Sequence, residues 1–514
     1  MSGRIIPGAE LSGHTTVTCD VCVIGSGAGG AVLAEGLVAR GLDVVMLEAG
    51  PHHTRDDFIP LDERWALSRL YQDSGGRATA DQAITVLQGR TVGGSTTVNW
   101  TTCFRTPERI LTHWAEHHGV EGYSSEDLRP HFEAVEARLN IKPWPSTNAN
   151  ENNRKLLEGC EKLGWKAEPL RRNVDGCADS GYCGLGCPVD AKQAMGITYI
   201  PDAVKGGMRL YCDVEATRLD VDGDRVRRVE ARALNRETNR ASGATLEVKA
   251  KLTVVSGGAI NSPALLLRSG LGDDGPVGQR TFLHPVVTLA ARYPEEVEGF
   301  FGAPQSIGSH QFIDRGPEKI GFFLEVPPLQ PVLASGGVSA MGIDQAAFMR
   351  ELPFMGVLIA LHVDGLLPGD DGGTVTLREQ GRVKLDYPIR PALAEGFRAS
   401  HEVMARIALA AGAQSVNSTH HPLVTVRSEG DLPLLQSARY GALEHAIFSA
   451  HQMGGCAMGS DPKTSVVRSD LRHHRLANLF IVDGSVLPTA LGVNPSETIY
   501  AIAHRAREAV AAAL

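Results

Sequence analysis

The sequence predicts an α/β fold in which a Rossmann-type dinucleotide-binding domain is joined to an α+β domain built on an antiparallel sheet. The first observation is a glycine-rich loop near the N-terminus, which lies between a short apolar run and an alanine-rich stretch. The second is a middle region rich in Pro, Gly and alternating residues, which is typical of antiparallel strands. The third is the length of 514 residues, which exceeds what one hydrophobic core usually spans.

The βαβ unit follows from four consecutive segments. The apolar run Cys19–Ile24 predicts a buried parallel strand. The loop 25–30 comes next, and the stretch Ala31–Arg40 predicts a helix that ends at Gly41, a natural helix stop. Asp43–Leu47 predicts the second parallel strand. A dinucleotide-binding domain of the Rossmann type begins with this order of elements.

Further strands are predicted far along the chain. Leu252–Ser256 and Leu479–Val482 predict two more parallel strands, so distant segments assemble one nucleotide-binding domain. Gly321–Val326 and Thr374–Ile389 predict strands of the antiparallel sheet, which would cap the cofactor and shape a pocket. We therefore predict a discontinuous cofactor-binding domain from residues 15–138, 200–284 and 445–514, and a substrate-binding cap domain from residues 139–199 and 285–444.

The glycine-rich loop carries the pattern G-x-G-x-x-G. Gly25 permits the tight turn, Gly27 lets the backbone approach a pyrophosphate, and Gly30 lets the helix pack close to the strand. Glu48 follows the second strand, where a carboxylate can accept hydrogen bonds from ribose hydroxyls. An acid at this position disfavours NADP, but the loop alone does not separate FAD from NAD.

Composition excludes several classes of protein. The net charge of −9 argues against nucleic-acid binding, which needs concentrated positive charge. The nine cysteines do not form a dense disulfide framework at this length, so a reducing compartment is expected. Met1–His14 lacks a signal-peptide pattern and no apolar run is long enough to span a bilayer. We expect a cytoplasmic protein, with peripheral membrane association left open.

Four segments point to a particular family. They are Gly89–Asn99 (GRTVGGSTTVN), Gly257–Gly272 (GGAINSPALLLRSGLG), His451–Gly459 (HQMGGCAMG) and Asp483–Ile499 (DGSVLPTALGVNPSETI). By the residues, order and spacing of these segments, the chain resembles the glucose–methanol–choline (GMC) flavoprotein oxidoreductases from about Asp20 to the C-terminus. The last two segments look most similar to the long-chain alcohol oxidase and cholesterol oxidase-like branch.

The resemblance implies that the cofactor is FAD. It implies a binding site formed by Gly25, Gly27, Ala28, Gly30, Glu48, Ala49, Arg90, Gly93, Gly94, Ser95, Asn99, Val214, Asp483, Asn494 and Pro495. Within that site it places the flavin ring near Asn99 and the neighbouring glycine pair, and the adenine near Val214. The pyrophosphate or ribityl chain is implied near Asp483.

The family also implies alcohol oxidation, with hydride transfer to flavin N5 and formation of an aldehyde or ketone. This chemistry needs a general base for the hydroxyl proton, and histidine has a suitable pKa without perturbation. We expect His451 to bind the substrate oxygen and act as this base, with Asn494 donating a second hydrogen bond. The expected substrate is a hydrophobic or cyclic alcohol.

Asn494 has a second interpretation as a helix N-cap. Asn494, Pro495 and Glu497 have the order of a helix start, with Asn as the cap, Pro in the first turn and Glu at the third position. A capping Asn can still donate from its amide nitrogen, so the two roles are compatible. A helix that begins at the flavin would stabilise the negative charge of the reduced ring.

Glu325 and three cysteines are further candidates. Glu325 lies in an apolar strand. If it is buried in a pocket, its pKa rises and it can serve as the base. If it is instead exposed on a half-buried strand, it has no role in the reaction. Cys177, Cys183 and Cys187 lie close together, but structural zinc needs four ligands, so no metal is expected. The segment around Cys183 is expected to form a loop over the flavin or the pocket entrance. His284 is expected to be structural.

The electron acceptor does not follow from the sequence. Oxygen, a quinone or another acceptor would use the same motifs. Two other functions stay open, because a fold does not determine a reaction. One is the catalytic subunit of a membrane- or partner-linked dehydrogenase, and the other is a non-oxidative lyase or decarboxylase on the same fold.

Overall fold

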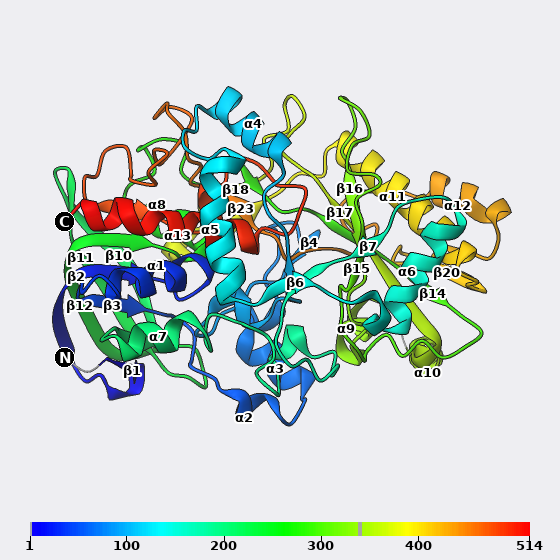
Figure 1. Cartoon of the computed structure of the whole chain (residues 1–514), viewed down its shortest axis with the longest axis horizontal. Coiled ribbons are helices and arrows are strands. Elements are labelled where there is room, and N and C mark those ends of the chain that lie inside the picture. Colours follow the sequence, from blue (N-terminus) through cyan, green and yellow to red (C-terminus); the bar gives the residue numbers. More distant parts are fainter. Residues whose placement is uncertain (1–2, 338–341) are drawn as a thin grey trace.

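Two large sheets form the framework of the molecule. The structure is a computed structural model and describes residues 3–337 and 342–514. One sheet has eight strands and the other has nine. Figure 1 shows them at opposite ends of the longest axis, with both chain termini beside the first sheet. The predicted cap segment 285–444 contains residues 338–341, which lie outside the described residues.

The first sheet contains the parallel strands that the sequence predicts. Its order is β1 (Arg4–Pro7), β9 (Arg209–Cys212), β3 (Val44–Leu47), β2 (His14–Ile24), β12 (Ala241–Val255), β11 (Arg225–Leu234) and β10 (Val214–Asp222), with β24 (Leu479–Ile481) also on β12. The pairs β2–β3, β2–β12 and β12–β24 are parallel. Strands from three distant parts of the chain therefore lie side by side, as predicted.

Helices lie in layers over the first sheet. Those that pack on its strands are α1 (Ala28–Val38), α7 (Tyr199–Lys205) and α8 (Gly258–Arg268), and those in further layers beyond α1 are α13 (Ser496–Ala512) and α5 (Ser125–Arg138). The helix α1 packs against both α13 and α7, and α13 packs against α5. Nine of the eleven residues of α1 are buried, which fits its small alanine and glycine side chains.

The second sheet is largely antiparallel. Its order is β21 (Thr425–Val426), β20 (Ser415–Ser418), β14 (Val286–Arg292), β17 (Met355–His362), β16 (Phe322–Glu325), β15 (Ile307–Ser309) and β7 (Glu168–Pro169), with β22 (Ile447–Ser449) on β14 and β4 (Ile84–Val86) on β22. The helices α11 (Pro391–Ala410) and α6 (Glu151–Lys162) pack against it. The prediction of a strand within Gly321–Val326 is confirmed by β16.

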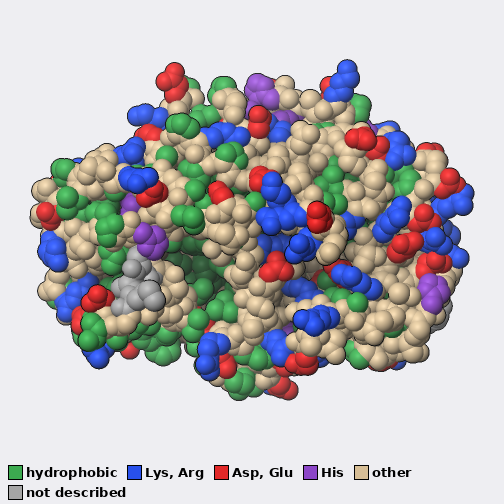
Figure 2. Space-filling view, turned by 180° about the vertical axis from the view of Figure 1, so that it is seen from behind, with side chains coloured by type: hydrophobic (Ala, Val, Ile, Leu, Met, Phe, Trp, Pro, Cys, Tyr) green, Lys and Arg blue, Asp and Glu red, His purple; other side chains and the backbone are tan. Residues whose placement is uncertain are grey.

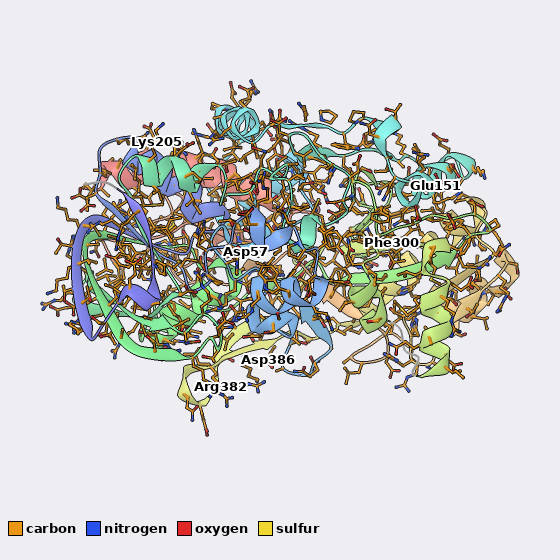
Figure 3. The ribbon with its side chains drawn as sticks, turned by 90° about the horizontal axis from the view of Figure 1, so that it is seen from below. Asp57, Glu151, Lys205, Phe300, Arg382 and Asp386 are labelled. Carbon is orange, nitrogen blue, oxygen red and sulfur yellow. The ribbon has the colours of Figure 1, made fainter. Side chains whose placement is uncertain are left out.

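The segment Thr374–Ile389 contains antiparallel strands, as predicted, but the prediction that they belong to the large antiparallel sheet is wrong. Its strands β18 (Thr374–Leu377) and β19 (Val383–Asp386) pair with each other as a two-stranded sheet, separate from the nine-stranded one. The hairpin packs against α8. Figure 3 shows Arg382 and Asp386 on this hairpin, on the side of the view opposite Lys205 and Glu151.

The remaining elements are short. The helices are α2 (Arg55–Phe58), α3 (Glu63–Leu70), α4 (Glu108–His118), α9 (Pro331–Gly337), α10 (Ile343–Arg350) and α12 (Leu432–Ser437); the strands are β5 (Thr102–Cys103), β6 (Ile141–Pro143), β8 (Arg171–Asn173), β13 (Thr281–Phe282) and β23 (Met453–Gly454). None of the helices in the described part of the chain has the length and apolar character needed to cross a bilayer.

The division into domains stays a prediction. Each large sheet is flanked by its own cluster of buried apolar side chains. The strands β4 and β22 fall within segments predicted for the cofactor-binding domain, yet both pair within the nine-stranded sheet. These strands join the second sheet to the loops around the site described next.

Candidate active site

A cavity of about 910 Å³ is lined by residues from both large sheets. Its volume is at the upper end of the range for ligand pockets. Most of the predicted site residues line it, namely Gly25, Gly27, Ala28, Glu48, Ala49, Arg90, Gly94, Ser95, Asn99, Val214, His451, Asp483, Asn494 and Pro495. Gly30, Gly93 and Glu325 lie behind this lining. The fold therefore brings together segments that are separated by more than 400 positions in the chain.

The first glycine loop has the geometry that its three glycines predict. Gly25 has a φ of 106°, and a Cβ there would lie 2.2 Å from the carbonyl oxygen of Ser256. A Cβ on Gly30 would lie 2.0 Å from the carbonyl oxygen of Gly25, so this glycine permits close packing of α1 on β2. A Cβ on Gly27 would meet only the Cα of Gly94, at 3.8 Å, and Gly27 lines the cavity.

Glu48 holds two parts of the loop in place. One carboxylate oxygen accepts from the Ser26 amide at 3.0 Å and the Ser26 hydroxyl at 2.6 Å. The other oxygen accepts from the Gly50 amide at 2.7 Å. Burial raises the pKa of this carboxyl, and the hydrogen bonds oppose the shift. Glu48 lines the cavity, so a ribose contact is compatible with these bonds and stays a prediction.

The second glycine loop is tied to the first through Ser26. The Gly93 amide donates to the Ser26 hydroxyl at 3.0 Å, and Gly93 has a φ of 93°. Asn99 follows this loop and lines the cavity. Its buried Oδ1 has no hydrogen-bond partner within the described residues. A buried acceptor without a donor is costly, which indicates that a ligand completes this position.

Lys192 is a residue that the sequence analysis did not assign to the site. Its ammonium donates to the carbonyl oxygens of Thr97 at 2.5 Å, Asn99 at 3.2 Å and Cys183 at 2.5 Å. Burial lowers its pKa to about 8. The segment around Cys183 therefore packs against the second glycine loop and supports it from behind. A lone lysine carries no sequence signal for such a role.

Asp483 connects the start of α8 to the short 3-10 helix that follows it in the chain, Gly484–Val486. Its Oδ2 accepts from the Gly258 amide at 2.8 Å and the Ser262 hydroxyl at 2.5 Å, and its Oδ1 accepts from the Ser485 amide at 2.7 Å. Burial raises the pKa of this carboxyl. The helices α1, α8 and α13 all begin at residues that line the cavity. Their N-termini supply partial positive charge, which favours a diphosphate and a negatively charged ring.

The capping interpretation of Asn494 is wrong. Helix α13 begins at Ser496, and its N-cap position is Pro495, without a side-chain capping bond. Asn494 instead directs its amide nitrogen toward Glu325, 3.5 Å from Oε2, while its buried Oδ1 lacks a partner among residues 3–337 and 342–514. Glu497 is buried against Glu136 rather than capping, and burial together with Glu136 raises its pKa to about 8.

His451 is bonded to a second histidine. Its Nδ1 lies 3.2 Å from the Nδ1 of His284, and the Nε2 of His284 accepts from the Gly492 amide at 3.1 Å. Burial lowers the pKa of His451 to about 3, so its ring is uncharged at neutral pH. His284 is fully buried and has its pKa held well below the usual range by burial and by His451.

Glu325 is buried, as its role as a base would require. It is 0% exposed at the end of β16, and burial raises its pKa to about 8. Its Oε2 accepts from the side-chain amide nitrogen Nε2 of Gln305 at 2.5 Å, and its Oε1 has no partner in the described part of the chain. Gln305 and Asn494 line the cavity and both contact this carboxyl. Glu325 therefore lies one layer behind the cavity wall.

Several cations lie around the cavity without a motif to reveal them. Arg77 donates to the side-chain oxygens of Gln88 at 2.6 Å and Asn261 at 3.0 Å, and all three residues line the cavity. The lining also includes Arg232, Arg268, Arg378, Arg382 and Lys384. Figure 2 shows Lys and Arg side chains gathered beside a hollow near the middle of one face. Concentrated positive charge attracts an anionic ligand.

The chain is similar to known flavoproteins over nearly its whole length. The family model of GMC oxidoreductases matches residues 67–286 with its N-terminal part and residues 368–503 with its C-terminal part. An uncharacterised GMC-type oxidoreductase of Mycobacterium tuberculosis is 31% identical over 506 residues, covering 97% of this chain and 77% of the relative. A long-chain-alcohol oxidase of Arabidopsis thaliana is 31% identical over 507 residues, covering 95% and 68%.

The solved structures confirm the predicted fold class. Pyridoxine 4-oxidase from Mesorbium loti matches with a TM-score of 0.73 at 20% identity, covering 96% of this chain and 99% of that protein. The Rossmann-type cofactor-binding part and the sheet-based second part are both included in this match.

Proposed function

The chain belongs to the GMC oxidoreductase family, whose cofactor is FAD, and we propose that it oxidises a hydrophobic or cyclic alcohol to the aldehyde or ketone. The observation that carries this proposal is that His451 and Asn494 both line the cavity that the two glycine loops line. Two polar side chains in the wall of a nucleotide site can bind a hydroxyl group beside the reactive ring.

The residues present fit FAD. Gly27 leaves open backbone at the start of α1, where a diphosphate can approach the helix N-terminus, and Gly94 packs closely against Gly27. The unpartnered Oδ1 of Asn99 can accept a hydrogen bond from a ring N–H. Val214, Glu48 and Asp483 are proposed to contact the adenine, the ribose and the central part of the cofactor. When bound, FAD supplies the two-electron oxidation by accepting hydride at N5.

The substrate end is proposed to be apolar apart from its hydroxyl-binding pair. Trp100, Val286, Ile359, Leu361 and Phe448 line the same cavity as His451. An apolar wall with a few convergent polar groups favours a hydrophobic alcohol. The relative named as a long-chain-alcohol oxidase and the structural neighbour named as pyridoxine 4-oxidase support an alcohol as the substrate class.

The hydroxyl proton has two candidate acceptors. The sequence analysis expects His451 in this role, but a pKa near 3 makes it a weak base at neutral pH. Glu325 has its pKa raised to about 8, which is close to the optimum for proton transfer. Its Oε1 is free of protein partners within the described residues. We therefore propose that His451 and Asn494 hold the oxygen, and that the proton passes through a bridging water to the Glu325 carboxylate, which lies behind Asn494.

The experiment is anaerobic mixing of the FAD-loaded protein with a panel of alcohols, followed by the bleaching of flavin absorbance. We expect long-chain or cyclic alcohols to bleach the flavin and sugars to do so poorly. His451→Gln should slow bleaching by about 100-fold or more while FAD stays bound. His401→Gln removes a buried histidine outside the cavity lining and should bleach as the wild type does. Failure of every alcohol would overturn the proposal.

A further inference from the structure

His284 lies on a turn that a buried carboxylate holds in a strained conformation. It has a φ of 43°, which is uncommon for a residue other than glycine. The amides of Leu283 and His284 donate to the two oxygens of Asp364 at 2.8 Å and 3.1 Å. The Tyr387 hydroxyl donates to Asp364 at 2.6 Å. These bonds hold the backbone of His284 in its strained conformation, because such strain persists only where the surroundings over-determine it.

The His284 ring is bonded at both nitrogens. Its Nε2 accepts from the backbone amide of Gly492, which can only donate. A neutral imidazole with a lone pair on Nε2 carries its hydrogen on Nδ1. That Nδ1–H points to the Nδ1 of His451 at 3.2 Å. The Nδ1 of His451 must then be the acceptor, since two N–H groups cannot share this contact.

The tautomer of His451 follows from the same rule. A neutral ring that accepts at Nδ1 carries its hydrogen on Nε2. His451 lines the cavity, and Nε2 is the ring nitrogen left to face a ligand. We propose that His284 is a positioning residue that fixes the tautomer of His451, so that His451 presents an Nε2–H donor to the alcohol oxygen. This inference rests on the proposed function and deepens it.

The arrangement also joins the two halves of the substrate end. His284 bonds to His451 in one segment and to Gly492 in another, two residues before Asn494. One buried ring therefore orients His451 and anchors the backbone of the segment that carries Asn494. With the oxygen accepting from His451, the breaking O–H bond leaves its electron pair on oxygen, and its proton passes through a bridging water to the ionised Glu325 carboxylate.

Neutron diffraction of the deuterated, FAD-loaded protein tests the tautomer directly. We expect deuterium on Nδ1 of His284 and on Nε2 of His451. Deuterium on Nδ1 of His451 would overturn the inference. This readout does not depend on turnover, so it decides the tautomer even if no alcohol is oxidised and the proposed function fails.

Two substitutions of His284 test the positioning role in solution. His284→Leu removes both hydrogen bonds, and we expect kcat/KM for the alcohol to fall by about 10- to 100-fold with FAD still bound. His284→Asn places an amide N–H near the position of Nδ1 and should restore part of kcat. A merely structural role would instead lower kcat in step with the melting temperature in both variants. Unchanged kcat/KM in His284→Leu would refute the assignment.

His362 offers a matched control. It is a fully buried histidine near His284, and its Nδ1 and Nε2 are bonded to the Pro285 carbonyl at 2.8 Å and the Ser400 hydroxyl at 3.1 Å. It does not line the cavity. His362→Gln should cost stability but leave kcat/KM close to that of the wild type. Equal losses of kcat/KM in the His362 and His284 variants would also refute a specific role for His284.

Discussion

Replacement of Glu325 by glutamine removes one ionisable group from the site with little change in size. Burial raises the pKa of Glu325 to about 8, so the proton-accepting form gains population as pH rises toward 9. From that pKa, the ionised fraction is about 1% at pH 6, about 10% at pH 7 and about 90% at pH 9. The rate of flavin reduction at low alcohol concentration should therefore rise by about 90-fold from pH 6 to pH 9.

The assay is anaerobic stopped-flow absorbance of the wild type and Glu325→Gln across this pH range. An amide can still accept from Gln305, so the local geometry is kept while the ionisation is lost. We expect the variant to be slower by about 100-fold or more at pH 9 and to have a flat profile. A flat wild-type profile from pH 5 to pH 9 would instead fit His451, whose pKa lies near 3, and would refute the assignment to Glu325.

Three further predictions follow from other parts of the site. Gly27→Val should weaken FAD binding by about 100-fold, because the valine side chain enters the cavity at the helix N-terminus. Gly30→Ala should instead unfold the loop, because its Cβ would lie 2.0 Å from the Gly25 carbonyl oxygen. Flavin content and melting temperature distinguish the two effects. Lys192→Met should lower stability by about 3 kcal/mol in urea unfolding, because three backbone carbonyls lose a buried donor, and an unchanged midpoint would contradict that role. Glu497 has its folded pKa raised from 4.5 to about 8, so its stabilising contribution is lost as pH rises through that range. The melting temperature of Glu497→Gln should thus gain on the wild type from pH 5 to pH 8 and then level off; a constant difference would argue against the raised pKa of Glu497.

The nucleotide-binding unit was predictable because its determinants are local. The apolar runs, the loop of three glycines and the helix stop lie within about thirty consecutive residues, and each specifies its own backbone conformation. The structure confirms parallel β2, β3, β12 and β24. The cap on α13 was mispredicted because the order Asn, Pro, Glu fits a helix start, whereas tertiary contacts direct Asn494 to Glu325 and Glu497 to Glu136.

The sequence by itself determined the nucleotide fold and the identity of the polar side chains at the candidate site, since both depend on residue type and short-range spacing. Only the tertiary structure decided how those side chains act. His284 and His451 are 167 positions apart, and Glu325 and Asn494 are 169 apart, yet each pair is in direct contact. A tautomer and a pKa depend on the partners and burial that long-range packing creates, and no local pattern encodes them.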